Sequence, residues 1–306
     1  MRNCDLINAF VDFIRDIKHR AQRTIINYRS DLEQFVSFLT SGENRQPGEL
    51  EQASVLQNVS TDKIRAFMNY LQNKNYSQAS IRRKQATLIC FYNFLHSQHR
   101  SAFNPAIGVK VPKVEKRKPQ ILTEEQLWKL LYLPEPADWL GARDRAMLEL
   151  LCNTGIRVSE LVNLDVENID FQRQMLRVIS GSGKQRQLEL PLSAIEAIRH
   201  YLLLRQKQIG FYKKSAGTAL FINKFGGRLD TRSADRRIKK YILQVGLNKS
   251  ITPYDLRHSF AQKLIEQGSD AGRLCRLLGF ESVCTAQLYA ESLKTEQITA
   301  NYDSGR

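Results

Sequence analysis

Arg157 lies where one helix is expected to end and the next to begin. Gly155 follows an apolar stretch, residues 146–152, and fits the left-handed position that ends a helix. Glu160 lies one turn further on, so its carboxylate can orient the guanidinium. An arginine held in this way can bind a phosphate with its fork of donors, although an arginine at a helix start is more often solvated or ion-paired.

A second arginine, Arg257, lies one turn inside a helix whose start is clearly marked. Thr252 fits the cap, Pro253 the first helical position and Asp255 the third. By i, i+3 and i+4 spacing, one face carries Tyr254, Arg257, His258 and Ala261. Near a helix N-terminus, an arginine adds its donors to the positive end of the dipole, which favours a phosphate. His258 alone would more often be a buried structural histidine, so we expect it to support the site.

Lys184 follows a Gly-Ser-Gly turn between two segments with strand-like alternation, which predicts a β-hairpin. The turn is not a nucleotide-binding phosphate loop. That motif requires a glycine where Val178 stands and a serine or threonine where Gln185 stands. We therefore expect a lysine at the tip of a hairpin, which either reaches into a neighbouring groove or is simply solvated.

Tyr289 lies on a helix expected after the turn at Gly279, with Ser282 as its cap. The apolar stripe of this helix contains Val283, Ala286 and Ala290. At about 100° per residue Tyr289 lies off that stripe, so its hydroxyl should be free to be presented. With a pKa of about 10, a tyrosine is a poor nucleophile unless nearby cations stabilise its phenolate. The chain has 11 tyrosines, so position alone does not select this one.

The composition favours a polyanionic partner. The 306 residues carry 46 Lys and Arg against 31 Asp and Glu, a net charge of +15, and bases outnumber acids both in residues 1–111 and in the remainder. Counterion release drives the binding of such a protein to nucleic acid. Five scattered cysteines without a CxxC pair indicate reduced thiols and no zinc motif. No apolar run approaches the roughly 18 residues of a membrane span, and acids interrupt the apolar N-terminal stretch, so no signal peptide is expected.

Apolar residues at helical spacing predict four helices in the first hundred residues, and no strand. They cover residues 10–17, 25–39, 64–71 and 81–95, with Ser60 or Thr61 and then Ser77 as caps. Residues 104–119 contain three prolines and a cluster of bases without periodicity. This pattern predicts an extended linker, which either follows a phosphate backbone or is a solvated spacer.

A second domain is predicted to begin near residue 121, because Thr123 followed by two acids marks a helix start. Helical periodicity dominates up to residue 164. Two short strands are expected over residues 175–180 and 186–190. Helices return from residue 193 and are interrupted by a turn at 225–227. The predicted fold class is mainly α, with one small β-sheet in the second domain.

Five segments of the second half resemble the conserved boxes of tyrosine recombinases of the phage integrase family, most closely the bacterial Xer type. They read GIRVSEL at 155–161, GSGKQRQLELPL at 181–192, TPYDLRHSFA at 252–261, LLGFES at 277–282 and TAQLY at 285–289. One such box is a weak signal, whereas five in order at family-like spacing are a strong one. The resemblance covers nearly the whole chain. It implies a helical, SAM-like DNA-binding domain (1–108), a basic linker (109–120) and a mainly helical catalytic domain with a C-terminal tail (121–306).

The resemblance also implies a role for each residue. Arg157 and Arg257 would bind the scissile phosphate, and Glu160 would support the first of them. Lys184 would protonate the leaving 5′ oxygen, and Tyr289 would attack the phosphate to leave a 3′-phosphotyrosyl link. Two arginines and a lysine can stabilise this charge without a metal. The phosphotyrosine conserves the bond energy, so ATP is not needed and we expect no cofactor.

Two positions depart from the family pattern. The family normally has His, sometimes Lys, three residues before the second arginine, where this chain has Tyr254. It normally has His or Trp after the Leu-Gly of the fourth box, where this chain has Phe280. A tyrosine donates hydrogen bonds but is a poor base near neutral pH, and phenylalanine lacks a polar donor. We therefore expect slower or partner-dependent cleavage, with His258 able to take over part of the missing role.

Three functions are compatible with this sequence. The first is a cytoplasmic site-specific recombinase that acts as a pair of dimers on a pseudo-palindromic DNA site, alone or with a second recombinase. It would resolve chromosome or plasmid multimers or integrate an element. The alternative is a recombinase-derived DNA-binding regulator or partner subunit with impaired catalysis. The altered residues Tyr254 and Phe280 support this alternative. The family residues that the chain keeps oppose it: Arg157, Lys184, Arg257 and Tyr289. A nicking-closing topoisomerase is disfavoured, because the sequence shows no sign of its other domains.

Overall fold

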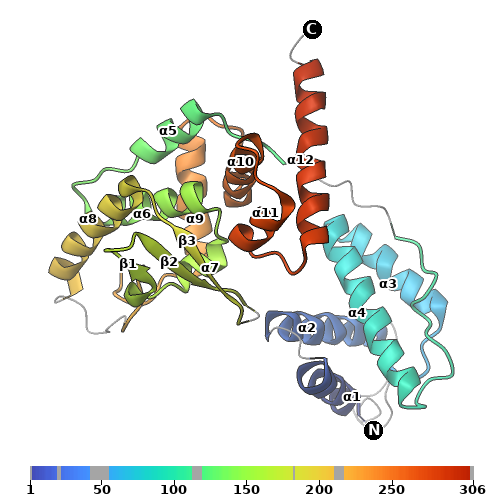
Figure 1. The fold of residues 1–306 in the computed structure, drawn as a ribbon. Helices are drawn as coiled ribbons and strands as arrows, with labels where there is room; N and C mark the ends of the chain where they lie inside the picture. The colour runs from blue at the N-terminus through green and yellow to red at the C-terminus, as the bar shows by residue number, and fades with distance from the viewer. Residues whose placement is uncertain are drawn as a thin grey trace. The chain divides into compact units, whose positions relative to one another are not determined.

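The computed structural model describes residues 2–18, 22–41, 55–111, 119–181, 183–209 and 217–303, with side chains up to residue 293 (Figure 1). The chain divides into two compact units, Met1–Lys116 and Arg117–Arg306. Residues 112–118 of the predicted linker lie outside the described residues, so the domain boundaries 1–108, 109–120 and 121–306 stay a prediction.

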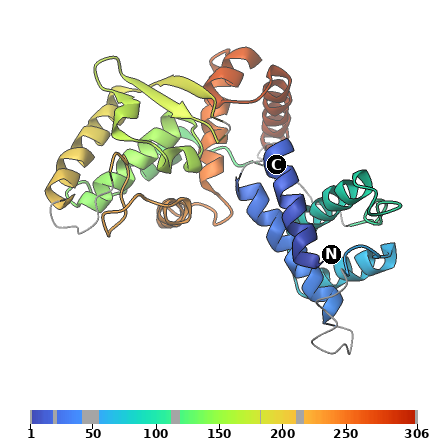
Figure 2. The same ribbon diagram turned by 90° about the horizontal axis from the view of Figure 1, so that it is seen from below.

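The first unit is helical over its described residues, as its sequence predicts. Its elements are α1 (Asn3–Asp12), which continues into a π-helical turn (Phe13–Ile17), α2 (Gln22–Thr40), α3 (Thr61–Asn73) and α4 (Gln78–Ser97) (Figures 1 and 2). The predicted caps are confirmed: the hydroxyl of Ser60 accepts from the amide of Lys63 at 3.3 Å, and that of Ser77 from the amide of Ser80 at 3.2 Å.

An aromatic core and one buried carboxylate hold these helices together. Phe10, Phe35, Phe67 and Phe91 are fully buried. Asp31 on α2 is 3% exposed and accepts from Lys84 Nζ at 2.7 Å and from Thr87 Oγ1 at 2.9 Å, both on α4. Arg83 also pairs with this carboxylate. The burial of Asp31 is therefore compensated by charge and hydrogen bonds, and it ties α2 to α4.

The second unit combines helices with one antiparallel sheet. Its helices are α5 (Glu124–Tyr132), α6 (Trp139–Thr154), α7 (Val158–Val162), α8 (Leu192–Ile209), α9 (Thr231–Gln244), α10 (Pro253–Glu266), α11 (Ala271–Leu278) and α12 (Val283–Asp303). A short 3-10 turn, Val166–Asn168, precedes the strands β1 (Ile169–Asp170), β2 (Met175–Ile179) and β3 (Gln185–Glu189), which pair in the order β1-β2-β3. The predicted hairpin and the mainly α fold class are confirmed. Strand β1 was missed, because two residues carry no readable alternation.

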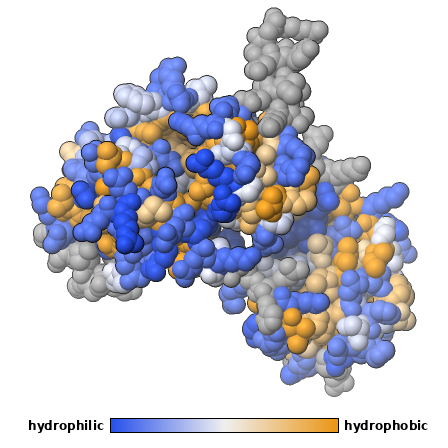
Figure 3. All heavy atoms as spheres, viewed as in Figure 1, coloured by the Kyte–Doolittle hydropathy of each residue, from blue (hydrophilic) through white to orange (hydrophobic). Residues whose placement is uncertain are grey.

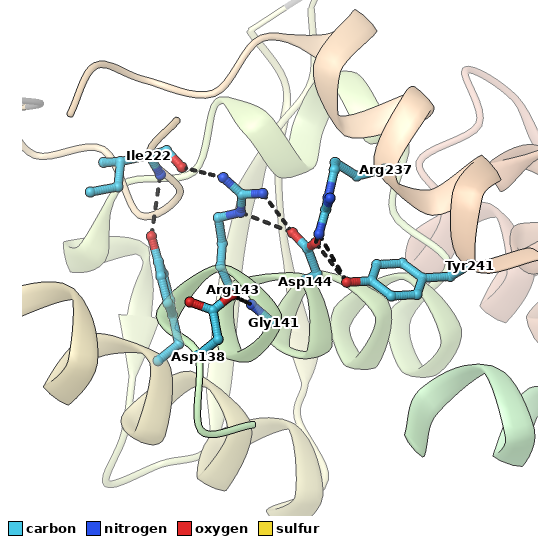
Figure 4. A network of polar contacts seen from close by, with 8 residues as sticks. Asp138, Gly141, Arg143, Asp144, Ile222, Arg237 and Tyr241 are labelled. Carbon is cyan, nitrogen blue, oxygen red and sulfur yellow. Dashed lines mark hydrogen bonds and ion pairs between the residues drawn. The ribbon is translucent and has the colours of Figure 1, made fainter. Parts of the chain in front are cut away.

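A buried polar network joins α6 to α9 inside this unit (Figure 4). Asp144 is 1% exposed and accepts from Arg143 Nη2 at 2.7 Å, from Arg237 Nε at 2.7 Å and from Tyr241 Oη at 3.0 Å. Arg143 also donates from Nη1 to the carbonyl oxygen of Ile222 at 2.8 Å. Burial and the neighbouring Asp144 charge raise the pKa of Tyr241 to about 12. The network fixes α9 against the helix that leads into Gly155.

Helices α10, α11 and α12 pack around a smaller apolar cluster, which contains Ala261, Leu264, Leu274, Leu278, Ala286 and Leu293. On the face drawn in Figure 3, hydrophilic residues predominate and apolar ones form small patches. Among the described residues, no helix is long and apolar enough to cross a bilayer.

Candidate active site

Arg157 lies at the junction of α6 and α7, as predicted, and is the residue directly before α7. Gly155 ends α6 with φ +61°, and a Cβ there would lie 2.5 Å from Cδ1 of Phe260, so glycine is required both for its conformation and for space. The carboxylate of Glu160 accepts from the amide of Arg157 at 2.8 Å and from its Nη1 at 3.2 Å. The side chain of Arg157 remains 36% exposed. Glu160 thus orients the first arginine without covering it.

Arg186, on β3, is a central residue that the sequence did not single out. Its Nη1 and Nη2 donate to the two carboxylate oxygens of Glu160 at 2.9 and 2.8 Å, and its Nε donates to the carbonyl oxygen of Leu277 at 2.9 Å. A Cβ at Gly279 would lie 2.8 Å from its Nη1. One signal was available: by period two Arg186 shares a face with buried Leu188, and a buried arginine requires partners.

Glu160 is ionised by its surroundings. Its burial alone would raise the pKa of this carboxyl. The hydrogen bonds and charge of Arg186, together with the amide and charge of Arg157, outweigh that effect and lower the pKa below its usual range. The site therefore contains a permanent carboxylate clamped between two arginines.

Arg257 lies on α10 and is 1% exposed. Its Nη1 donates to the carbonyl oxygen of Gly155 at 2.7 Å and its Nη2 to that of Leu278 at 2.6 Å. Its buried Nε has no hydrogen-bond partner in the described part of the chain. Burial first and the charge of Arg157 second lower the pKa of Arg257 to about 10, so it stays protonated at neutral pH. A rigid cation with an unused donor is suited to an anionic ligand.

Tyr289 lies on α12, and its hydroxyl is engaged rather than free. Tyr289 Oη lies 2.7 Å from His258 Nδ1, and the two rings stack with centroids 5.3 Å apart. The predicted stripe was wrong in part: Val283 is 51% exposed, whereas Ala286 is buried and Tyr289 packs against the same cluster. The tyrosine turns inward because α12 packs on both α10 and α11.

Burial also sets the acidity of Tyr289. It raises the pKa of this phenol above its usual value, and the coulombic influence of Tyr254 acts in the same direction. The charges of Arg257 and Arg157 lower it, but by less. Both arginines therefore act electrostatically on the tyrosine, which brings together three residues that the sequence predicted as one site.

The two unusual residues flank this tyrosine. Tyr254 is 48% exposed and meets the ring of His258 edge to face, with centroids 4.8 Å apart. The ring of Phe280 lies 5.0 Å from that of Tyr289 and 5.6 Å from Cζ of Arg257. Phe280 thus packs against both Tyr289 and the buried Arg257.

Lys184 lies at the base of the hairpin turn, not at its tip. The amide of Ser180 donates to the carbonyl oxygen of Lys184 at 2.8 Å, so these two residues close the turn. Ser182 lies outside the described residues. Lys184 is exposed and lines a hollow of about 960 Å³ together with Arg157 and Phe280. Arg157 also lines a second hollow, of about 430 Å³, with Lys239, Tyr254 and Arg257. The first arginine is therefore accessible from two sides.

No group of three or more His, Cys, Asp or Glu side chains that could hold a metal ion occurs among the described residues.

Comparison with known proteins shows which family the chain belongs to. Residues 120–296 match the model of the phage integrase family, and residues 7–99 match that of the phage integrase N-terminal SAM-like domain. The tyrosine recombinase XerC of Syntrophus aciditrophicus (strain SB) is 36% identical over 301 residues, 98% of this chain and 96% of the relative. XerC of Herpetosiphon aurantiacus is 37% identical over 284 residues, 92% of this chain and 89% of the relative.

Among solved structures, XerH site-specific recombinase bound to palindromic difH substrate, in a post-cleavage complex, superposes with a TM-score of 0.70. It is 20% identical and covers 92% of this chain and 80% of its own, so this likeness concerns the fold. The chain belongs to the phage integrase family, as its five boxes predicted. Within that family it is a tyrosine-type site-specific recombinase.

Proposed function

We propose that this recombinase cuts and rejoins duplex DNA through a covalent phosphotyrosine on Tyr289. The observation that carries the proposal is that Arg157 and Arg257, 100 residues apart in the sequence, line one hollow. The hydroxyl of Tyr289 contacts His258, the residue next to Arg257. Arg257 is buried with an unused Nε donor, and Arg157 is half-exposed beside two hollows. This pair can bind the two non-bridging oxygens of a phosphodiester.

The reaction follows from these charges. The phenol oxygen of Tyr289 attacks the phosphorus, the bond to the 5′ oxygen breaks, and a 3′-phosphotyrosyl ester forms. The arginines neutralise the charge that develops on the phosphorane, which is the largest contribution expected in such a site. We assign to Lys184 the proton that the leaving 5′ oxygen takes up. Rejoining is the reverse reaction with a new 5′ hydroxyl, and it needs no nucleotide because the ester conserves the bond energy.

The partner that this chemistry implies is double-stranded DNA. The net charge of +15 and the match of residues 7–99 to an N-terminal SAM-like domain support DNA binding by both units. By similarity to XerH, whose complex holds palindromic difH substrate, we infer a pseudo-palindromic site occupied by a pair of dimers. These would be made of this chain alone or of this chain with a second recombinase. We place this activity in the cytoplasm, where it would resolve chromosome or plasmid multimers or integrate an element.

A trapping experiment tests the proposal. The probe is a nicked duplex built on the sequence that the protein itself selects from a randomised duplex pool. The nick lets the leaving strand diffuse away, so cleavage accumulates as a protein–DNA adduct on a denaturing gel. We expect an adduct in EDTA and without nucleotide, and none from Tyr289→Phe, which removes only a hydroxyl.

Tyr302→Phe is the matched control and should leave the adduct unchanged. If the unaltered protein binds the selected duplex but forms no adduct, the covalent mechanism is wrong and the chain only binds DNA. A strict need for Mg²⁺ in the cleavage step would instead indicate metal-assisted hydrolysis.

A further inference from the structure

The hydroxyl of Tyr289 has one hydrogen-bond partner in the described part of the chain, and it is a histidine. The distance from Tyr289 Oη to His258 Nδ1 is 2.7 Å, and the stacked rings are inclined by only 19°. A phenol must lose its proton when it forms a phosphate ester. In the tautomer that carries its hydrogen on Nε2, Nδ1 of His258 is the acceptor for that proton.

Among the described residues, the other aromatic side chains near Tyr289 do not offer a comparable base. Phe280 lies against the ring and has no acceptor. Tyr254, at the position where the family has His or Lys, is itself a phenol and a poor base near neutral pH. Burial opposes spontaneous ionisation of Tyr289, because it raises the pKa of the phenol. The attack therefore needs a base within hydrogen-bond reach.

We propose that His258 is a catalytic residue of this recombinase, the general base that takes the proton of Tyr289. The inference rests on the function proposed above. In the cleavage step the proton moves from Oη to Nδ1, the bond from Oη to phosphorus forms, and the bond from phosphorus to the 5′ oxygen breaks. That oxygen takes a proton from Lys184. In rejoining each proton returns to its donor, so atoms and charge balance over the cycle.

The local fold supports this assignment. His258 follows Arg257 directly on α10, so one helix presents both a phosphate-binding cation and the base. The edge of Tyr254 meets one side of the imidazole, and the ring of Tyr289 stacks on it, which holds the imidazole in place. Tyr254 thereby positions the base instead of serving as one. Tyr254 stands where the family has His or Lys, and in this chain His258 takes the role of base instead.

The test compares variants that separate holding the tyrosine from deprotonating it. In His258→Asn the amide oxygen can occupy the place of Nδ1 and keep the hydrogen bond, but it cannot carry the proton away. We expect its rate of adduct formation on the nicked duplex to fall by about 10²-fold or more, within the usual range for general base catalysis. DNA affinity and the melting temperature should be unchanged. His200→Gln, an exposed histidine on α8, is the matched control and should react at the unaltered rate.

Two further measurements exclude a structural role. Imidazole added to His258→Ala should restore part of the rate, since it refills the vacated place with a base. A duplex with sulfur in place of the leaving 5′ oxygen needs no proton donor, so it should rescue Lys184→Ala but not His258→Asn. Equal rates for His258→Asn and the unaltered protein would overturn the inference while leaving the phosphotyrosine intact. Absence of any adduct from the unaltered protein would overturn both.

Discussion

Two clusters in the second unit each consist of a carboxylate held by two arginines, but they differ in how accessible the arginines are. In one, Asp144 lies between Arg143 and Arg237. In the other, Glu160 lies between Arg157 and Arg186. Both carboxylates are buried, and both accept hydrogen bonds from each of their arginines.

The clusters differ in the hydrogen-bond partners of Arg143 and Arg157 and in the hollows that lie beside them. The side chain of Arg143 is 4% exposed, and it donates to Asp144 and to a backbone carbonyl oxygen. Arg157 donates to one carboxylate alone, keeps 36% of its side chain exposed and faces two hollows. We therefore expect the first cluster to stabilise the fold, and we propose that the second presents a cation to the scissile phosphate. Exposure alone does not separate the clusters, because the side chain of Arg237 is 33% exposed. The difference is that Arg157 also lines two hollows, whereas Arg237 lines neither of them.

The largest effect is expected from Asp144→Asn. It leaves the buried Arg143 and the partly exposed Arg237 without their counter-charge, which costs about 3–5 kcal/mol of unfolding free energy. Urea unfolding of the second unit measures this loss. Under conditions where the variant is still folded, its rate of adduct formation should match that of the unaltered protein. A stable variant with slow cleavage would break the comparison, because Asp144 would then belong to the reactive site.

Arg157→Ala should give the opposite pattern. The unfolding free energy should change little, because the arginine is half-exposed and Arg186 still pairs with Glu160. Adduct formation should fall by about 10²-fold to 10³-fold, or about 3–4 kcal/mol of barrier, as for loss of one charge-stabilising donor. Rate and stability are measured on the same preparation. If stability falls but the rate does not, the cation at residue 157 is structural.

The smallest effect concerns the pH dependence of Glu160→Gln. Because the folded pKa of Glu160 lies below its unfolded value near 4.5, ionised Glu160 stabilises the fold above that value. This contribution is lost as pH falls through the folded pKa. Near pH 7 the variant should therefore be less stable than the unaltered protein by about 2 kcal/mol, and the gap should narrow below about pH 4.5. A gap that stays constant from pH 7 to pH 3 would contradict the assigned charge of Glu160.

The sequence predicted the parts of this site that depend on local rules. Gly155 and Gly279 end their helices with positive φ, and Thr252 and Asp255 form the start of α10 as expected. The order of the boxes also singled out Arg157, Arg257 and Tyr289, because each box has its own short pattern of residue types; their catalytic roles stay a prediction.

The missed features depend on contacts between segments far apart in the chain. The carbonyl of Leu277 lies 91 residues from Arg186, and Tyr241 lies 97 residues from Asp144. No periodicity in one segment can indicate such a partner. The hydroxyl of Tyr289 was expected to be free for the same reason. The apolar stripe was inferred from the sequence of α12 alone, whereas the partner of the hydroxyl, His258, lies on α10. The local spacing of residues determines that α12 is a helix. The packing of α10, α11 and α12 determines where the side chain of Tyr289 points.

The most direct test of the account is to identify the residue that carries the DNA. The adduct formed on the nicked duplex would be digested with protease and nuclease, and the nucleotide-linked peptide sequenced by tandem mass spectrometry. The account predicts one modified peptide, with the 3′ phosphate on Tyr289 and none on Tyr302, the tyrosine nearest the C-terminus. A phosphate on Tyr302, on Tyr254 or on a serine would contradict it.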